Sequence, residues 1–151
     1  KASGLANVQY LRFGRFFVLL ATRGQHAFFE GEGHFKDARE EPIRFQGYSV
    51  SVKRGVDGRW HPSVRLHPDT YRELRAYFVG LATHRSVEAL SVELRRLPFE
   101  PYAPVRRQLL NILRALNRAR RVAGLEPVPT SSLRLSRKGV KPFGEEMKEA
   151  A

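Results

Sequence analysis

The sequence predicts an α+β fold in which an antiparallel β-hairpin or sheet packs against several helices, with a basic C-terminal helix and tail. Segments in the first half alternate apolar and polar residues, which is typical of half-buried strands. Segments in the second half repeat apolar residues at helical spacing. The 151 residues, 42% of them hydrophobic, suffice for one core and leave little room for two. We therefore expect one domain over residues 1–144 and a tail over residues 145–151.

The first apolar run covers residues 10–21 (YLRFGRFFVLLA) and fits a short helix or a strand equally well. Residues 25–35 (QHAFFEGEGHF) follow, with two acidic residues among glycines. Carboxylates in such a segment can hold a hard divalent ion such as Mg²⁺, and the alternative is an acidic turn without an ion. Residues 36–42 (KDAREEP) are charged and predict a loop.

A β-hairpin is predicted next. Residues 43–53 alternate with a break at Gly47, which indicates a bulge, and residues 59–67 alternate again after a turn at residues 54–58. Pro62 favours an edge or irregular position. One face carries Trp60, Val64 and Leu66. The opposite face collects basic and hydrogen-bonding side chains: Arg44, Gln46, Ser49, Ser51, Lys53, Arg59, His61, Ser63 and Arg65.

Two helices are expected after the hairpin. Asp69 can cap a helix that runs to Phe78 and ends at Gly80. Its apolar stripe, which we expect in the core, consists of Tyr71, Leu74, Tyr77 and Phe78. Ser86 can cap a second helix over residues 86–97, which the prolines of residues 98–104 end.

A third, strongly amphipathic helix is predicted over residues 105–123, with Gly124 as its C-cap. Residues 125–144 have no regular pattern. The side expected in the core carries Leu109, Ile112, Leu113 and Leu116. The side expected in water carries Arg106, Arg107, Arg114, Arg118, Arg120 and Arg121.

The charge is strongly positive. The formal net charge is +12, and 21 of the 27 basic residues are arginine. A GC-rich or thermophilic genome explains the preference for arginine over lysine, but not the imbalance of charge. Residues 101–144 hold ten basic residues against the single acid Glu126. Arginine binds phosphates and guanine edges in a fork geometry, so we expect a nucleic-acid partner, with Arg137 and Lys138 of the C-terminal segment among the contacts.

Other classes of function are excluded or disfavoured. The chain has no cysteine, which excludes disulfides, thiolate metal sites and cysteine nucleophiles. No apolar run approaches the length of a membrane span, and we expect no membrane partner and a cytoplasmic location. There is no phosphate-binding loop, dinucleotide fingerprint or zinc pattern.

The segment QHAFFEGEGHF resembles the signature of the LAGLIDADG homing endonucleases, often written LAGFFEGEGSF. Residues 28–33 match residue for residue, and Ala27 stands where that family has its helix-packing glycine. Residues 58–80 (GRWHPSVRLHPDTYRELRAYFVG) are similar to the family's second strand and following helix. Residues 94–113 (LRRLPFEPYAPVRRQLLNIL) are similar to its late Tyr-Pro turn and helix. Together these segments hold 54 of the 151 residues.

The resemblance implies a fold unit of helix, hairpin, helix, hairpin and helix, with one motif per chain and therefore a homodimer. Glu32 occupies the position of the family's metal-binding acid, and Glu30 that of the earlier acid, which caps or supports. Two Glu32 carboxylates would hold Mg²⁺ against the scissile phosphates. Lys53 is the candidate basic group near the phosphates. The polar hairpin face, from Arg44 to Arg65, would read base edges in the major groove.

Three functions remain open at this point. The first is a Mg²⁺-dependent, site-specific DNA endonuclease. The second is a non-catalytic regulator from a phage or mobile element, which binds DNA, host RNA polymerase or another transcription protein. The third is an RNA-binding protein. In the first two, the expected DNA contacts are the polar hairpin face and the exposed arginines Arg106, Arg107, Arg114, Arg118 and Arg121, with Arg137 and Lys138.

Overall fold

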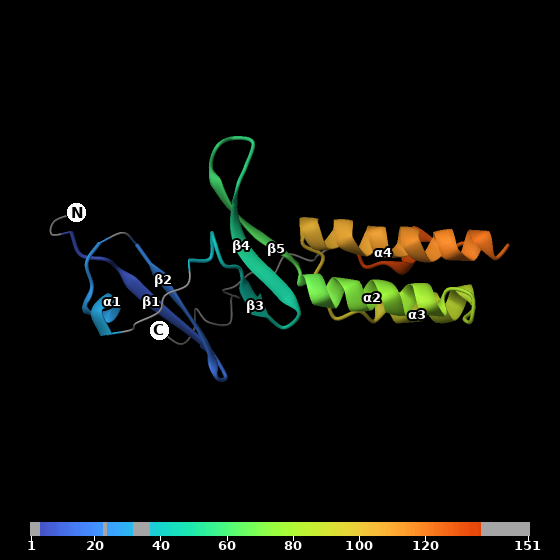
Figure 1. The fold of residues 1–151 in the computed structure, drawn as a ribbon, viewed down its shortest axis with the longest axis horizontal. Helices are drawn as coiled ribbons and strands as arrows, with labels where there is room; N and C mark the ends of the chain where they lie inside the picture. Colours follow the sequence, from blue (N-terminus) through green and yellow to red (C-terminus); the bar gives the residue numbers. More distant parts are fainter. Residues whose placement is uncertain (1–3, 23, 32–36, 137–151) are drawn as a thin grey trace, which may run out of the picture. The chain divides into compact units, whose positions relative to one another are not determined.

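The computed structural model describes residues 4–22, 24–31 and 37–136 (Figure 1). The chain divides into two compact units, Lys1–Asp37 and Ala38–Ala151, and each is described by itself. Two antiparallel sheets and a group of helices confirm the predicted α+β class. The single domain expected over residues 1–144 stays a prediction.

The first unit is built on a β-hairpin. Strands β1 (Val8–Phe13) and β2 (Phe16–Ala21) pair antiparallel, so the apolar run forms strands rather than a helix. Gly14, with φ of +59°, supplies the left-handed turn residue between them. Helix α1 (Ala27–Gly31) follows and covers part of the acidic motif.

The second unit begins with a three-stranded antiparallel sheet in the order β3-β4-β5. Its strands are β3 (Ile43–Phe45), β4 (Tyr48–Arg54) and β5 (Trp60–Leu66). Strand β4 is central and β5 is an edge strand. The edge position predicted from Pro62 is therefore confirmed, since an edge strand tolerates the missing N–H.

The bulge predicted at Gly47 is wrong. Gln46 and Gly47 have φ of 44° and 78° and form a two-residue turn, which closes on the pair Phe45–Tyr48. Two left-handed residues give a hairpin turn whose twist matches that of the strands. The predicted long strand is therefore two strands.

Helices form the rest of the second unit. They are α2 (Pro68–Leu81), α3 (Val87–Arg95) and α4 (Ala103–Val122), followed by the short 3-10 helix η1 (Thr130–Ser132). Helices α2 and α4 run side by side, and η1 packs against α3 (Figure 1). Apart from η1, residues 125–136 are irregular, as predicted.

Helix ends agree with the sequence in part. Ser86 caps α3 by accepting a hydrogen bond from the N–H of Ala89 at 3.2 Å, as predicted. The cap of α2 is His67 rather than Asp69, because the His67 ring accepts from the Asp69 N–H. Helix α2 also continues through Gly80 to Leu81, so the predicted end was one residue early.

The core of the second unit lies between the sheet and the helices. The predicted inner side of α4 is buried: Leu109, Ile112, Leu113 and Leu116. It meets Leu66 from the sheet, Phe78 from α2 and Leu90 from α3, all of which are fully buried. Tyr77 was expected in the core, but its side chain is 53% exposed and donates a hydrogen bond to Glu93 at 3.1 Å.

Arg120 was expected in water, but it is buried, with only 4% of its surface exposed. Its guanidinium donates to the carbonyl oxygens of Ala82 at 2.7 Å and Arg85 at 2.9 Å, and to that of Glu126. These carbonyls replace water around the buried charge and hold the α2–α3 turn to α4.

The fold unit implied by the resemblance would place its second hairpin within residues 79–93. These residues instead form the end of α2, a turn and most of α3. No helix in the described part of the chain is long and apolar enough to cross a membrane.

Candidate nucleic-acid interface

Four arginines of α4 lie along one side of the helix. Positions 107, 114, 118 and 121 are seven, four and three residues apart, close to two turns, one turn and one turn of an α-helix. All four side chains are exposed. The set, Arg107, Arg114, Arg118 and Arg121, is called the arginine stripe below. It extends about 21 Å along the helix axis at about 1.5 Å per residue.

The arginine stripe has no acidic counterpart on its own helix, because α4 contains no aspartate or glutamate. Among the residues that the structure describes, none of the four guanidinium groups forms an ion pair with a carboxylate. Arg114 donates to the side chain of Asn111 at 3.0 Å, and Arg121 donates to the carbonyl of Asn117 at 3.3 Å. Since a guanidinium has five N–H donors, most of them face solvent.

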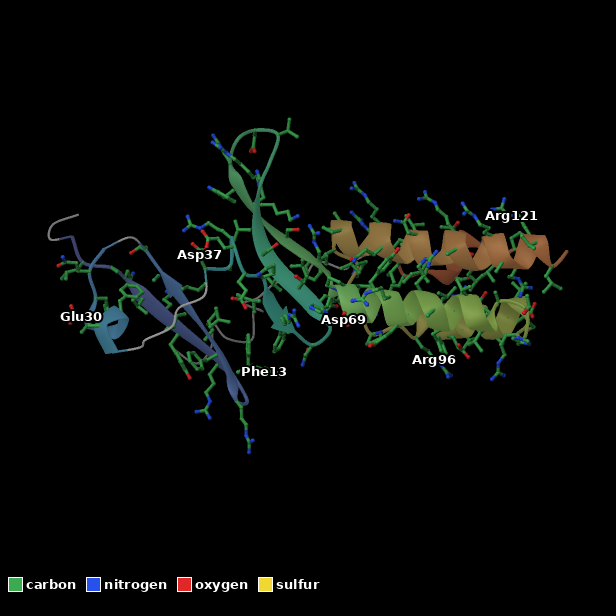
Figure 2. The ribbon with its side chains drawn as sticks, in the orientation of Figure 1. Phe13, Glu30, Asp37, Asp69, Arg96 and Arg121 are labelled. Atoms are coloured by element: carbon green, nitrogen blue, oxygen red, sulfur yellow. The ribbon has the colours of Figure 1, made fainter. Side chains whose placement is uncertain are left out.

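The arginine stripe lies on the outer side of α4. Figure 2 shows Arg121 on the outer side of α4 and Arg96 on the far side of the layer, beyond α2 and α3. Arg106 lies off the stripe and donates to the carbonyl of Leu135 at 3.4 Å. The exposed positive charge of α4 is therefore concentrated on one outer side.

The strand register places the predicted polar side chains on one face of the sheet. Arg44, Ser49 and Arg65 form one row across the three strands, and Ser51–Ser63 and Lys53–His61 are the next two pairs. Gln46 lies in the β3–β4 turn, and Arg59 just precedes β5.

This face offers fewer exposed groups than the sequence predicts. Ser49 and Ser51 are buried, because they lie on the central strand, where Arg44 and Arg65 flank Ser49. Ser63 and Arg65 are half-buried. The exposed members of the face are Arg44, Lys53 and His61, with Gln46 and Arg59 exposed in the neighbouring turns.

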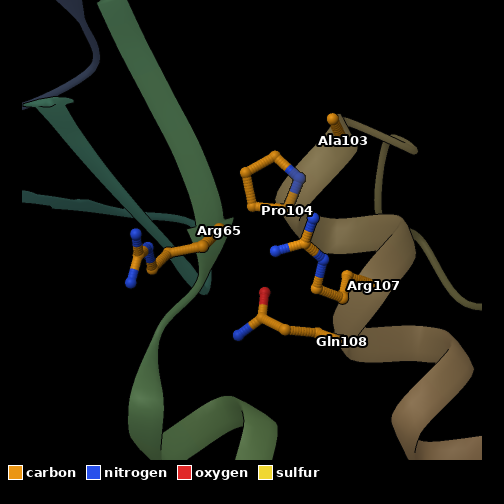
Figure 3. Close-up of a pocket in the computed structure, with 5 residues that line it drawn as sticks. All are labelled: Arg65, Ala103, Pro104, Arg107 and Gln108. Atoms are coloured by element: carbon orange, nitrogen blue, oxygen red, sulfur yellow. The ribbon is translucent and has the colours of Figure 1, made fainter. Parts of the chain in front are cut away.

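A pocket of about 300 Å³ lies between β5 and the start of α4, which carries the first arginine of the stripe. Arg65 of β5 lines it together with the start of α4: Ala103, Pro104, Arg107 and Gln108. Figure 3 shows the Arg107 guanidinium extending toward β5, while the Arg65 side chain points to the other side of its strand. The Arg65 Nε atom is buried and has no hydrogen-bond partner among the described residues. Arg65 and Arg107 therefore both lie at the junction of β5 and α4.

The turn between β4 and β5 is held by its own hydrogen bonds. Gly55 donates to the carbonyl of Arg59 at 2.7 Å, and Arg54 donates through Nε to the carbonyl of Gly58 at 2.9 Å. The Asp57 carboxylate lies 2.9 Å from His61 Nε2 and accepts from the Arg59 N–H at 3.1 Å. The hydrogen bond from His61, and then that from Arg59, lower the pKa of Asp57 below its usual 3.8.

The predicted catalytic residues are only partly described. Glu30 is exposed on α1, and Lys53 is exposed on β4 opposite His61. Glu32, the predicted metal ligand, lies outside the described residues, as do Arg137 and Lys138. In residues 4–22, 24–31 and 37–136, no three His, Asp or Glu side chains come together as a possible metal site. The geometry of a Mg²⁺ site is therefore not part of the argument for function.

Two residues of the interface were missed by the sequence reasoning. Gln108 lines the pocket, and Asn111 lies next to the stripe, where it accepts from Arg114. Their positions follow from the helical period, since 111 lies four residues after 107 and three before 114, and 108 lies three residues before 111.

Comparison with protein-family models, curated proteins and solved structures finds no match to this chain.

Proposed function

We propose that the protein binds double-stranded DNA, with the arginine stripe on the phosphate backbone and the polar face of the sheet toward base edges. The observation that carries the proposal is the line of four exposed guanidinium groups on a helix without acidic residues. Duplex DNA presents about one negative charge per 1.7 Å of its axis. A rigid helix with cations along about 21 Å matches such a polyanion, and binding releases counterions.

The neighbouring sheet favours DNA over RNA as the partner. The major groove of B-DNA is about 12 Å wide and admits a two-stranded ribbon, whereas the major groove of an RNA helix is deep and narrow. The β4–β5 pair is such a ribbon, and Lys53, His61 and Arg44 are exposed on its polar face or on the adjoining strand. These side chains supply hydrogen-bond donors for base edges or phosphates.

Strand cleavage is a further prediction of the LAGLIDADG resemblance. It depends on Glu32 and, with less direct involvement, on Glu30. DNA binding through α4 does not require either carboxylate, because the stripe contacts phosphates by charge and hydrogen bonds alone. Binding and cleavage can therefore be tested separately.

Binding is tested by fluorescence anisotropy of a labelled DNA duplex. The variant Arg114→Gln/Arg118→Gln/Arg121→Gln removes three charges from the stripe but keeps polar, helix-compatible side chains. The matched control, Arg75→Gln/Arg95→Gln/Arg96→Gln, removes three exposed charges from α2 and from the end of α3. We expect the stripe variant to bind about tenfold or more weakly, and the control to change by less than about threefold.

Equal losses in the two variants would contradict a specific role of the stripe and leave only non-specific attraction by net charge. A duplex RNA and an acidic polypeptide serve as competitors. If the acidic polypeptide displaces the DNA at equal charge concentration, an acidic protein surface such as that of a transcription factor or polymerase replaces DNA as the proposed partner. Efficient displacement by the RNA would favour the RNA-binding function.

A further inference from the structure

The β4–β5 hairpin extends beyond the helices that pack against its other end (Figure 1). Along β5, Leu66 is fully buried, Ser63, Val64 and Arg65 are half-buried, and residues 60–62 are exposed. The hairpin is therefore anchored in the core by the end near Leu66. Its other end, with the turn at residues 55–59, lies beyond these helices.

Trp60 is exposed at this end. It is the only tryptophan of the chain, and 55% of its surface is accessible. By strand alternation it shares a face with Leu66, so it is on the side of the sheet that packs against the helices, but beyond their reach. A tryptophan carries a large flat apolar surface, which suits it to stack on another ring.

One cation shares the face of Trp60: Arg54 is its partner across the strands. Lys53 and Arg59 neighbour this pair in the sequence but belong to the opposite, polar face of the hairpin end. The one acid of the turn, Asp57, is engaged with His61 and the Arg59 N–H. An exposed aromatic ring beside an arginine suits a nucleobase attached to phosphates, because bases stack on aromatic rings while the cation pairs with the backbone. It is poorly suited to a purely apolar ligand.

The turn that precedes Trp60 is closed by its own hydrogen bonds. Hydrogen bonds from Gly55 to Arg59, from Gly58 to Gly55 and from Arg54 to Gly58 close the turn on itself. Residues ordered before binding lose less entropy when a ligand arrives. An exposed ring beside an ordered turn and an arginine has the properties of a stacking platform.

We propose that Trp60 stacks on an unpaired base, so that the protein binds DNA containing an unpaired base in preference to fully paired DNA. This inference rests on the proposed function. The faces of paired bases are covered by their neighbours in the duplex, and a protein ring reaches them only where a base is unstacked or unpaired. The arginine stripe would hold the duplex while Trp60 contacts the unpaired base.

The experiment compares two labelled DNAs that differ only in one bulged nucleotide. Because Trp60 is the sole tryptophan, its fluorescence reports directly on stacking. We expect the bulged DNA to quench this fluorescence and to bind about tenfold more tightly than the paired duplex, which is about 1.4 kcal/mol. Anisotropy of the labelled DNA measures affinity in variants that lack tryptophan.

Three variants make the test specific. Trp60→Leu should lose the preference for bulged DNA while keeping its affinity for the paired duplex, which also shows that the variant is folded. Trp60→Phe should retain much of the preference, since it keeps a ring. Tyr77→Leu, which removes a similarly exposed ring from α2, should behave as the unchanged protein does.

Equal affinity of the unchanged protein for the two DNAs would overturn the inference, as would a preference that survives in Trp60→Leu. If the paired duplex still binds through the arginine stripe in either case, the proposed function stands and only the role of Trp60 fails. If neither DNA binds, both proposals fail together.

Discussion

Gln108 of α4 binds the backbone of Leu66 at the free edge of β5 as a neighbouring strand would. Its Oε1 accepts from the Leu66 N–H at 2.7 Å, and its Nε2 donates to the Leu66 carbonyl at 3.2 Å. Leu66 is fully buried, so these backbone groups have no access to water as an alternative partner. This pair of bonds fixes the start of α4, and with it Arg107, against the sheet.

The first prediction concerns this contact. Gln108→Leu should lower the free energy of unfolding by about 1–3 kcal/mol, because it leaves a buried N–H and carbonyl without partners. Urea unfolding followed by the helical circular dichroism signal measures the effect. Asn111→Leu is the matched control on the exposed side of α4, with an expected change within about 0.5 kcal/mol. An equal effect in the two variants would show that the Leu66 contact contributes nothing specific.

Arg120 should be more important for stability than its exposed neighbour. Arg120→Met leaves the carbonyls of Ala82, Arg85 and Glu126 without their donor and should cost about 2–4 kcal/mol in the same unfolding experiment. Arg121→Met removes an equal charge from the exposed stripe and should change stability by less than about 0.5 kcal/mol. A small effect of Arg120→Met would contradict the assignment of the buried guanidinium as a link between α4 and the α2–α3 turn.

Acid should destabilise the β4–β5 turn, because it protonates the Asp57 carboxylate. The pKa of this carboxyl is lowered by hydrogen bonds from His61 and from the Arg59 N–H. Because the pKa of Asp57 is lowered in the folded state, the charged carboxylate stabilises the turn. This stabilisation is present above the usual pKa of 3.8 and is lost as the pH falls through the lowered pKa. An NMR titration of the Asp57 carboxyl should show a midpoint below 3.8, which rises toward 3.8 in His61→Ala. A midpoint at or above 3.8 in the unchanged protein would show that these hydrogen bonds do not form.

The resemblance to LAGLIDADG endonucleases predicts Mg²⁺-dependent cleavage by a homodimer. The protein is incubated with Mg²⁺ and a library of randomised duplexes, and new DNA ends are sequenced. Discrete cuts related by a two-fold axis should appear and should vanish in Glu32→Gln, while DNA binding persists. A protein that binds the library, makes no cuts and sediments as a monomer would favour the non-catalytic regulator.

Much of the second unit could be predicted from the sequence because its signals are local. The helical period alone places Leu109, Ile112, Leu113 and Leu116 in the core and aligns the arginine stripe on the opposite side. Strand alternation likewise identifies the residues that share a face of the sheet. These patterns depend only on backbone geometry, so a single sequence contains them.

Other features depend on partners that are distant in the sequence. Arg120 is buried because carbonyls 35 and 38 residues away accept its hydrogen bonds, and no local pattern shows this. The β3–β4 turn was missed because Gln46, rather than the usual Asn, Asp or Gly, adopts the left-handed conformation at its first position. The burial of Ser49 required knowledge that β4 is the central strand, with Arg44 and Arg65 on either side.

The central claim is that the arginine stripe contacts DNA phosphates, and the salt dependence of duplex binding tests it most directly. Each phosphate contact contributes about 0.9 to the slope of log K against log salt concentration. The slope of Arg114→Gln/Arg118→Gln/Arg121→Gln should therefore be smaller in magnitude by about 3 than that of the unchanged protein, while Arg75→Gln/Arg95→Gln/Arg96→Gln keeps its slope. A slope that is unchanged in the stripe variant, or reduced equally in the control, would contradict the claim.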